Sequence, residues 1–237
     1  METRDLNRAY LNTIGRKTPE GVYYSLQHGT SSSQIIVINF HGNYQSIVSS
    51  TSFFDNMKSD VNAIYDVEYR GYANVPGSPD EKSLSKDLKS FIQWVKQNHP
   101  NKHIVLGGYS LGASLVLFNL HTLANETSGV IVFSPFSSLT DIVKRIWFLK
   151  IFIVRDCGWN VLREVQKGSN TPVLIFGAKD DNVVPIELTT MLADELEGKN
   201  YLNEFVVFRN GGHMLPFSPS HENKIFKTIL SFLQNIS

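Results

Sequence analysis

The chain has little of several features that would direct a protein to a particular partner or compartment. It has one cysteine, Cys157, so it forms no internal disulfide, and a reducing compartment is expected. Lys plus Arg and Asp plus Glu number 22 each, and no basic stripe stands out, which argues against a nucleic-acid partner. No apolar run reaches the roughly 20 residues that span a bilayer, and no signal-peptide core or lipidation motif begins the sequence. We therefore expect a cytoplasmic protein without an integral membrane segment, and leave peripheral membrane contact and oligomeric state open.

What the sequence does contain is a regular alternation of strand-like and helix-like segments. Apolar runs and alternating patterns predict strands at 21–29, 34–42, 62–72, 102–110, 129–135, 171–181 and 203–213. Helical spacing predicts helices at 45–58, 78–100, 111–125, 186–197 and 219–235. Such alternation indicates an α/β fold, with a mainly parallel central sheet covered by helices on both faces. We expect one domain over residues 1–237.

One segment, residues 137–170, departs from this alternation. Its nine residues 146–154 carry a single charge, Lys150, and are too few to span a membrane. Two interpretations stay open. The segment is ordinary core, or it is a small cap over an active site, which an apolar substrate would enter. The side chains that would line such a cap are Trp147, Phe148, Phe152 and Trp159.

A glycine-fenced serine lies between a predicted strand and a predicted helix. The stretch Gly108-Tyr109-Ser110-Leu111-Gly112 matches G-x-S-x-G, the nucleophile elbow, in which a sharp strand-to-helix turn lifts a serine above the sheet edge. Glycines two residues before and after the serine avoid collisions within the turn. The strand before and the helix after the motif are the setting it requires, so Ser110 is the predicted nucleophile.

A serine nucleophile needs a base and an acid, which in elbow enzymes follow it in the order acid, then histidine. His213 is the predicted base, because it follows a late strand and two glycines, whereas His221 opens the last helix. Asp180 and Asp181 both follow the strand before it, and the residues alone do not separate them. Whichever aspartate does not orient the imidazole is expected to cap the next helix or to bond loop amides.

Two backbone amides are predicted to bind the oxyanion. Leu111, directly after the serine, begins a helix whose N-terminal amide is free for this purpose. The second donor should come from the loop after the strand at 34–42, where Asn43 is the first choice and Tyr44 the alternative. Tyr44 is also a candidate substrate contact, and His41 is expected to support the loop.

With the predicted nucleophile, acid, base and oxyanion amides at these positions, the sequence resembles an α/β-hydrolase over about residues 22–235. It is similar to the compact group of depalmitoylases and bud-emergence-type hydrolases, and more distantly to the prolyl oligopeptidase catalytic domain. The stretches that carry the resemblance are His41-Gly42-Asn43, Tyr69 to Glu81, Ser134-Pro135-Phe136 and Gly177 to Asp180. The resemblance implies Ser110, Asp180 and His213 as the triad, with Asn43 and Leu111 as oxyanion amides.

The expected activity is hydrolysis of a carboxylic ester or thioester, on a small-molecule or acylated substrate, through an acyl-enzyme. No metal or other cofactor is required for this chemistry. A serine peptidase with the same residues is the alternative enzyme, and an inactive hydrolase fold kept for binding is the alternative of another class.

Overall fold

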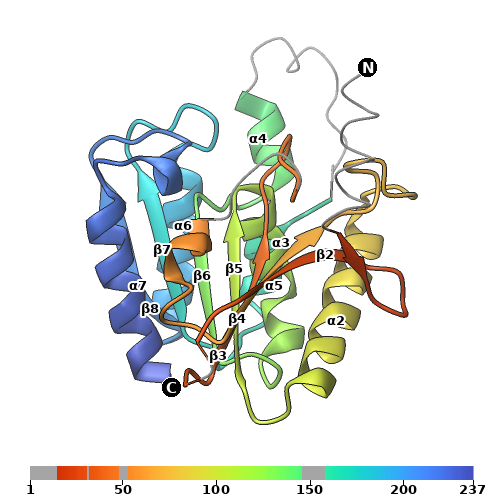
Figure 1. Ribbon diagram of the computed structural model, residues 1–237. Coiled ribbons are helices and arrows are strands. Elements are labelled where there is room, and N and C mark those ends of the chain that lie inside the picture. The colour runs from red at the N-terminus through yellow and green to blue at the C-terminus, as the bar shows by residue number, and fades with distance from the viewer. Residues whose placement is uncertain (1–14, 31, 48–52, 146–157, 237) are drawn as a thin grey trace, which may run out of the picture.

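Eight strands form one sheet in the computed structural model, which describes residues 15–30, 32–47, 53–145 and 158–236 (Figure 1). In chain order they are β1 Arg16–Lys17, β2 Tyr23–His28, β3 Ile35–Phe40, β4 Ala63–Glu68, β5 His103–Tyr109, β6 Gly129–Phe133, β7 Val173–Ala178 and β8 Leu202–Phe208. Across the sheet the order is β1-β2-β4-β3-β5-β6-β7-β8. β2 pairs antiparallel with β1 and β4, and every other neighbouring pair is parallel. The predicted α/β fold with a mainly parallel sheet is confirmed.

Helices cover both faces of this sheet (Figure 1). One face packs against α2 Glu81–Asn98, α3 Leu111–Asn119, α5 Val161–Val165 and α6 Ile186–Gly198. The other face packs against the short 3-10 helix η1 Phe53–Met57 and the last helix α7 Glu222–Ile236. Strands β3 to β7 are buried along nearly their whole length because both of their faces are covered, which explains their continuous apolar sequences.

Three short elements lie in the connections. The 3-10 helix η2 Leu120–Leu123 extends α3, and η4 Leu215–Phe217 follows β8. Helix α4 Leu139–Arg145 projects from the top of the sheet in Figure 1. In the described ranges, no helix combines the length and apolar content that crossing a membrane requires.

The helix predicted at 45–58 is wrong for most of its length. Residues 45–47 lie in a loop, 48–52 lie outside the described residues, and one 3-10 helix covers Phe53–Met57. The loop makes its hydrogen bonds elsewhere: the Ile47 amide donates to the Glu68 side chain, and the Gln45 side chain accepts from the Gly42 amide. These contacts replace the bonds that a helix would have formed.

The segment at 137–170 leaves the sheet and returns to it at neighbouring points. Ser138 and Asn160 form an isolated antiparallel bridge, and the Leu162 amide donates to the Ser137 carbonyl at 3.0 Å. Trp159, which the cap interpretation placed in a substrate pocket, is instead packed in the core, with its ring 5.6 Å from that of Phe118. The candidate lining residues Trp147, Phe148 and Phe152 lie outside the described residues, so the cap stays a prediction.

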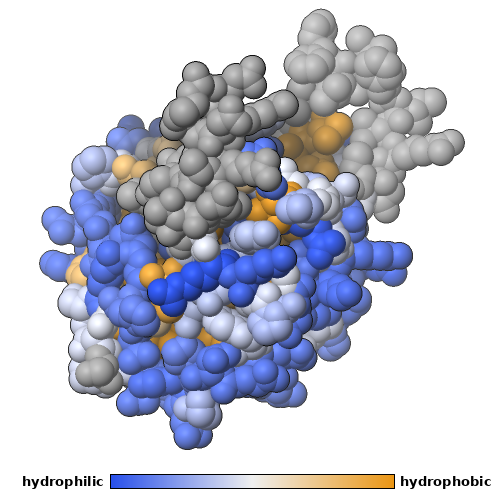
Figure 2. All heavy atoms as spheres, turned by 45° about the vertical axis from the view of Figure 1, so that its right-hand side comes forward, coloured by the Kyte–Doolittle hydropathy of each residue, from blue (hydrophilic) through white to orange (hydrophobic). Residues whose placement is uncertain are grey.

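Figure 2 shows that the surface on one side of the molecule is mainly hydrophilic, with its largest hydrophobic areas in the upper half of the view. Some exposed apolar side chains come from loops at the carboxyl ends of the strands, as Tyr44, Val183 and Met214 do. In an open α/β sheet the ligand crevice lies at that edge.

Candidate active site

The candidate site begins where strand β5 meets helix α3. Ser110 lies at this junction with φ of 52° and ψ of −109°, a conformation that costs a non-glycine residue about 1–3 kcal/mol. The Ser110 amide donates to the Phe133 carbonyl at 2.9 Å, and the Ser114 amide donates to the Ser110 carbonyl at 3.0 Å. These bonds to a neighbouring strand and to the following helix hold the serine in the strained geometry that the elbow sequence predicts.

Both glycines of the motif lie where a side chain would not fit. A Cβ atom on Gly108 would lie 2.7 Å from backbone atoms at the start of α3. A Cβ atom on Gly112 would lie 2.0 Å from the Phe40 carbonyl oxygen and 2.8 Å from that of His41. The first turn of α3 therefore packs directly on the end of β3, which brings the loop after β3 beside Ser110.

Ser110 belongs to a chain of hydrogen bonds that ends on a buried carboxylate. His213 Nε2 lies 3.0 Å from Ser110 Oγ, and His213 Nδ1 lies 2.8 Å from Asp181 Oδ2. When Nδ1–H donates to the carboxylate, Nε2 is free to accept the proton of the serine hydroxyl. The three residues come from the ends of β5, β7 and β8, and their arrangement is the one that general-base activation of a hydroxyl needs.

The placement expected for Asp180 is wrong, because the aspartate beside the imidazole is Asp181. The chain turns after β7, with the Asp181 amide donating to the Ala178 carbonyl at 3.3 Å, and this turn points consecutive side chains in different directions. The Asp181 side chain is 1% exposed, whereas Asp180 is exposed. The carboxylate that contacts His213 is thus one residue after the one that the resemblance implied.

Two backbone amides orient the Asp181 carboxylate. Its Oδ1 accepts the amides of Val183 and Val184, at 2.9 and 2.8 Å. An aspartate side chain commonly accepts such bonds from the amides two and three residues ahead, and since either aspartate could do so, this rule does not separate them in the sequence. Two backbone amides thus hold one carboxylate oxygen and leave the other for His213.

Asp180 holds the loop that carries the histidine. Its two carboxylate oxygens accept the amides of Gly211 and Gly212, at 3.3 and 2.8 Å. The two glycines have φ of 127° and 57°, values that other residues rarely adopt. Of the two roles expected for the aspartate that does not contact the imidazole, capping the next helix or bonding loop amides, Asp180 has the second.

The surroundings keep Asp181 ionised. Burial raises the pKa of this carboxyl. The hydrogen bond and charge of His213 and the amides of Val184 and Val183 lower it by more in sum, so the pKa lies below its usual value. The Tyr109 ring centroid lies 5.1 Å from that of the His213 ring. Burial and the nearby charge of Asp181 raise the pKa of the Tyr109 phenol. A neutral phenol therefore packs on the imidazole.

The predicted oxyanion amides lie on the two backbone segments that meet at Ser110. Leu111 is the first residue of α3, so its amide has no acceptor within the helix. Asn43 follows Gly42 in the loop that packs on α3, and its side-chain Oδ1 accepts the Tyr72 hydroxyl at 2.6 Å. Tyr44 has φ of 61° and is 96% exposed, so its side chain makes little contact with the protein.

A second strained serine lies at the end of the neighbouring strand. Ser134 follows β6 with φ of 48° and donates its amide to the Phe176 carbonyl at 2.9 Å. Its Oγ is buried and has no hydrogen-bond partner among the described residues. Ser134 thus shares the backbone setting of Ser110 but lacks a histidine partner.

No group of three or more His, Cys, Asp or Glu side chains that could hold a metal ion occurs within the described ranges. The residues that sequence reasoning did not single out are Glu68, Tyr69 and Tyr72, which contact the loop after β3. Tyr69 and Tyr72 lie in the stretch Tyr69 to Glu81, which the resemblance had marked without assigning it a role, and Glu68 directly precedes it.

The family profile described as serine aminopeptidase, S33, matches residues 31–155, more than half of the chain. The chain belongs to this family of α/β-hydrolases. The profile of the prolyl oligopeptidase family matches residues 158–237 of this chain. The resemblance seen in the sequence is confirmed.

Curated relatives share about a quarter of their aligned residues with this α/β-hydrolase. Lysophosphatidylserine lipase ABHD12 of Danio rerio is 27% identical over 168 residues, which cover 64% of this chain and 42% of that protein. Protein bem46 of Schizosaccharomyces pombe is 25% identical over 188 residues, covering 76% and 62%. The chain thus spans about half the length of these relatives.

Solved structures share the fold. A monoacylglycerol lipase of Paleococcus ferrophilus matches with a TM-score of 0.70 and 18% identity, over 91% of this chain and 99% of that one. An esterase of Pyrococcus furiosus matches with a TM-score of 0.73 and 18% identity, over 94% and 91%. At this identity the likeness concerns the fold.

Proposed function

We propose that this α/β-hydrolase is a serine hydrolase that cleaves carboxylic esters or thioesters through Ser110, His213 and Asp181. The observation that carries the proposal is the continuous path from Ser110 Oγ to His213 Nε2 at 3.0 Å and from His213 Nδ1 to Asp181 Oδ2 at 2.8 Å. The residues occur in the chain order that elbow hydrolases use.

The reaction follows from these contacts. His213 Nε2 takes the hydroxyl proton as Ser110 Oγ attacks the acyl carbon, and Asp181 stabilises the imidazolium that forms. The amides of Leu111 and Asn43 bind the oxyanion of the tetrahedral intermediate. The intermediate collapses as His213 gives its proton to the departing alcohol or thiol, which leaves an acyl-serine. Water then attacks the acyl-serine with the same proton transfers and releases the acid.

Names of the similar proteins favour esters over amides. A lysophosphatidylserine lipase, a monoacylglycerol lipase and an esterase all have names that denote ester hydrolases. Ester-linked acyl lipids are therefore the first substrate class to test. Exposed apolar side chains at the site edge, such as Met214 beside His213, suit an acyl chain.

A peptidase is the second candidate, because both matching family profiles have peptidase names. A panel that contains p-nitrophenyl esters from acetate to palmitate, thioesters, and aminoacyl and prolyl p-nitroanilides distinguishes the two. Hydrolysis of the anilides with the esters left intact would overturn the ester assignment.

A fluorophosphonate probe tests the nucleophile. The wild type should be labelled, and Ser110→Ala should lose both labelling and ester turnover while keeping its circular dichroism spectrum. Ser134→Ala is the matched control, since it removes another buried serine hydroxyl from a strand end with positive φ. It should retain labelling and wild-type turnover. A wild type that the probe does not label and that hydrolyses none of the panel would support a binding protein instead.

A further inference from the structure

The loop that carries the proposed oxyanion amide of Asn43 makes two hydrogen bonds of its own, on either side of a strained residue. Tyr44, the next residue, has φ of 61°, a strained value for a tyrosine. Within the loop, the Gln45 amide donates to the Gly42 carbonyl at 3.3 Å, a long bond. The Gly42 amide donates to the Gln45 side chain at 2.9 Å. Contacts from outside the loop add to these bonds.

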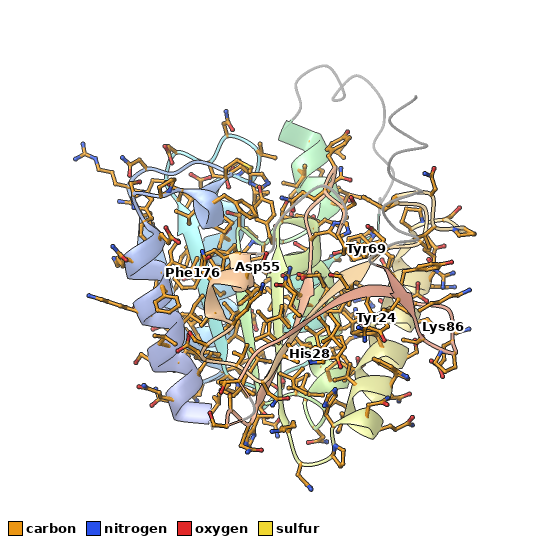
Figure 3. All side chains as sticks on the ribbon, viewed as in Figure 1. Tyr24, His28, Asp55, Tyr69, Lys86 and Phe176 are labelled. Carbon is orange, nitrogen blue, oxygen red and sulfur yellow. The ribbon has the colours of Figure 1, made fainter. Side chains whose placement is uncertain are left out.

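Those contacts come from residues 68–72, which begin at the last residue of β4. Glu68 holds the two ends of the loop, because its side chain lies 2.9 Å from His41 Nε2 and accepts the Ile47 amide at 3.0 Å. The Tyr69 hydroxyl donates to the His41 carbonyl at 2.7 Å. Figure 3 shows Tyr69 above Tyr24 and His28, toward the end of the molecule where α4 projects.

His41 is held at both of its ring nitrogens. Its Nδ1 lies 2.8 Å from the Gly42 carbonyl oxygen, which can only accept a hydrogen bond. Its Nε2 lies 2.9 Å from Glu68 Oε1. The Glu68 side chain is fully buried, and it meets a third donor in the Tyr69 amide at 3.0 Å. A buried carboxylate with this many donors is costly to displace.

Tyr72 contacts the oxyanion residue itself. Its hydroxyl donates to Asn43 Oδ1 at 2.6 Å, since an amide oxygen is only an acceptor. Burial raises the pKa of Tyr72, and the nearby charge of Glu68 raises it further, so the hydroxyl keeps its proton at neutral pH. The Tyr72 ring also packs on the rings of His41 and Tyr69, with centroids 5.6 and 5.3 Å apart.

From these contacts we propose that Tyr72 is a positioning residue, which aims the Asn43 amide at the oxyanion by holding the Asn43 side chain, while Glu68 and Tyr69 fix the start of the loop. The proposal rests on the proposed serine-hydrolase function. Tyr72 does not touch the substrate in this role. Its effect appears in the transition state, where the oxyanion forms, and not in substrate binding.

Tyr72→Phe removes the hydroxyl and keeps the ring. The variant should hydrolyse a p-nitrophenyl ester with a kcat lowered roughly threefold to tenfold and an unchanged KM, as expected for one lost neutral hydrogen bond. The inhibition constant of a trifluoromethyl ketone, whose hemiketal oxyanion occupies the same hole, should rise by the same factor. A role in folding alone would not couple these two values.

Tyr65→Phe is the matched control. It also removes one tyrosine hydroxyl that bonds a side chain, His99 Nε2 at 2.6 Å, and it does so away from the loop after β3. It should leave kcat and the inhibition constant at wild-type values. Equal losses in both variants would overturn the proposal.

Asn43→Ala is a second test, because it removes the acceptor of the Tyr72 hydroxyl and keeps the backbone amide of residue 43. It should reproduce the loss of Tyr72→Phe, and the double variant should lose no more than either single variant. Additive losses, or wild-type kcat and inhibition in Tyr72→Phe, would overturn the positioning role. An enzyme in which Ser110→Ala retains turnover would refute the proposed function itself, which is a different outcome.

Discussion

The two adjacent aspartates show how one residue of register separates two roles. Asp181 is buried against His213, and Asp180 is exposed and holds the amides of Gly211 and Gly212. Hydrophobic pattern and strand position placed both residues after β7 but could not say which side chain turns inward. The hydrogen bonds of the turn decide this, and they depend on the amides of Val183 and Val184.

We predict that Asp181→Asn lowers kcat by roughly three to four orders of magnitude, because the amide cannot stabilise the imidazolium and favours the wrong tautomer. Asp180→Asn should lower kcat by about tenfold or less, since it weakens only loop contacts worth about 1 kcal/mol. The measurement is steady-state hydrolysis of a p-nitrophenyl ester by both variants. The reverse ranking would restore Asp180 as the acid.

At the scale of the elements, the sequence predicted those whose pattern is local and strong. The apolar runs of β3 to β7 and the helical spacing of α2, α6 and α7 lie where they were expected. The failures were contacts between segments. The loop after β3 makes its bonds to Glu68 and not along a helix, and Trp159 packs on Phe118. Neither partner lies within a local window of sequence.

The contact between α3 and β3 is the element-scale feature that the elbow requires. Gly112→Ala would place a Cβ atom 2.0 Å from the Phe40 carbonyl oxygen, and neither backbone can rotate away. We expect the free energy of unfolding to fall by roughly 2 kcal/mol or more and kcat to fall at least tenfold, as α3 moves away from the loop after β3.

Gly198→Ala is the control for this substitution, because Gly198 ends α6 and its added Cβ would have nothing within 4 Å. Urea unfolding should show unchanged or slightly raised stability for it, by up to about 1 kcal/mol. If Gly112→Ala were as stable and active as this control, the close packing of α3 on β3 would be refuted.

For the whole molecule, strand order was the property that the sequence could not supply. Alternation predicted the strand near Tyr23–His28 but not that it pairs antiparallel with β4, because a strand's neighbours are set by the connections between strands. The sequence predicted that a serine, an aspartate and a histidine follow three strands in this order, as Ser110, Asp181 and His213 do. Their meeting depends on β5, β7 and β8 ending at one edge of the sheet.

The buried Asp181 carboxylate couples the stability of the whole molecule to acid pH. The folded pKa lies below the usual 3.8, because the bonds from His213, Val184 and Val183 outweigh burial, which raises it. A carboxyl whose pKa is lowered on folding contributes stability that is fully present above the unfolded pKa. This contribution is lost as the pH falls through the folded pKa. The wild type should therefore lose stability relative to Asp181→Asn as the pH falls from about 5 to about 2.5.

Urea unfolding of both proteins at several pH values in this window gives the test. Groups that titrate alike in the two proteins cancel in the difference of their unfolding free energies, so the difference reports on Asp181 and on what it binds. The unfolding free energy of the wild type minus that of Asp181→Asn should fall steadily as the pH falls through 3.8, the usual pKa of the carboxyl. A difference that stays constant to the acid end would mean that His213 and the two valine amides do not stabilise the ionised form. The carboxylate would then lack the fixed charge that the proposed mechanism assigns to it.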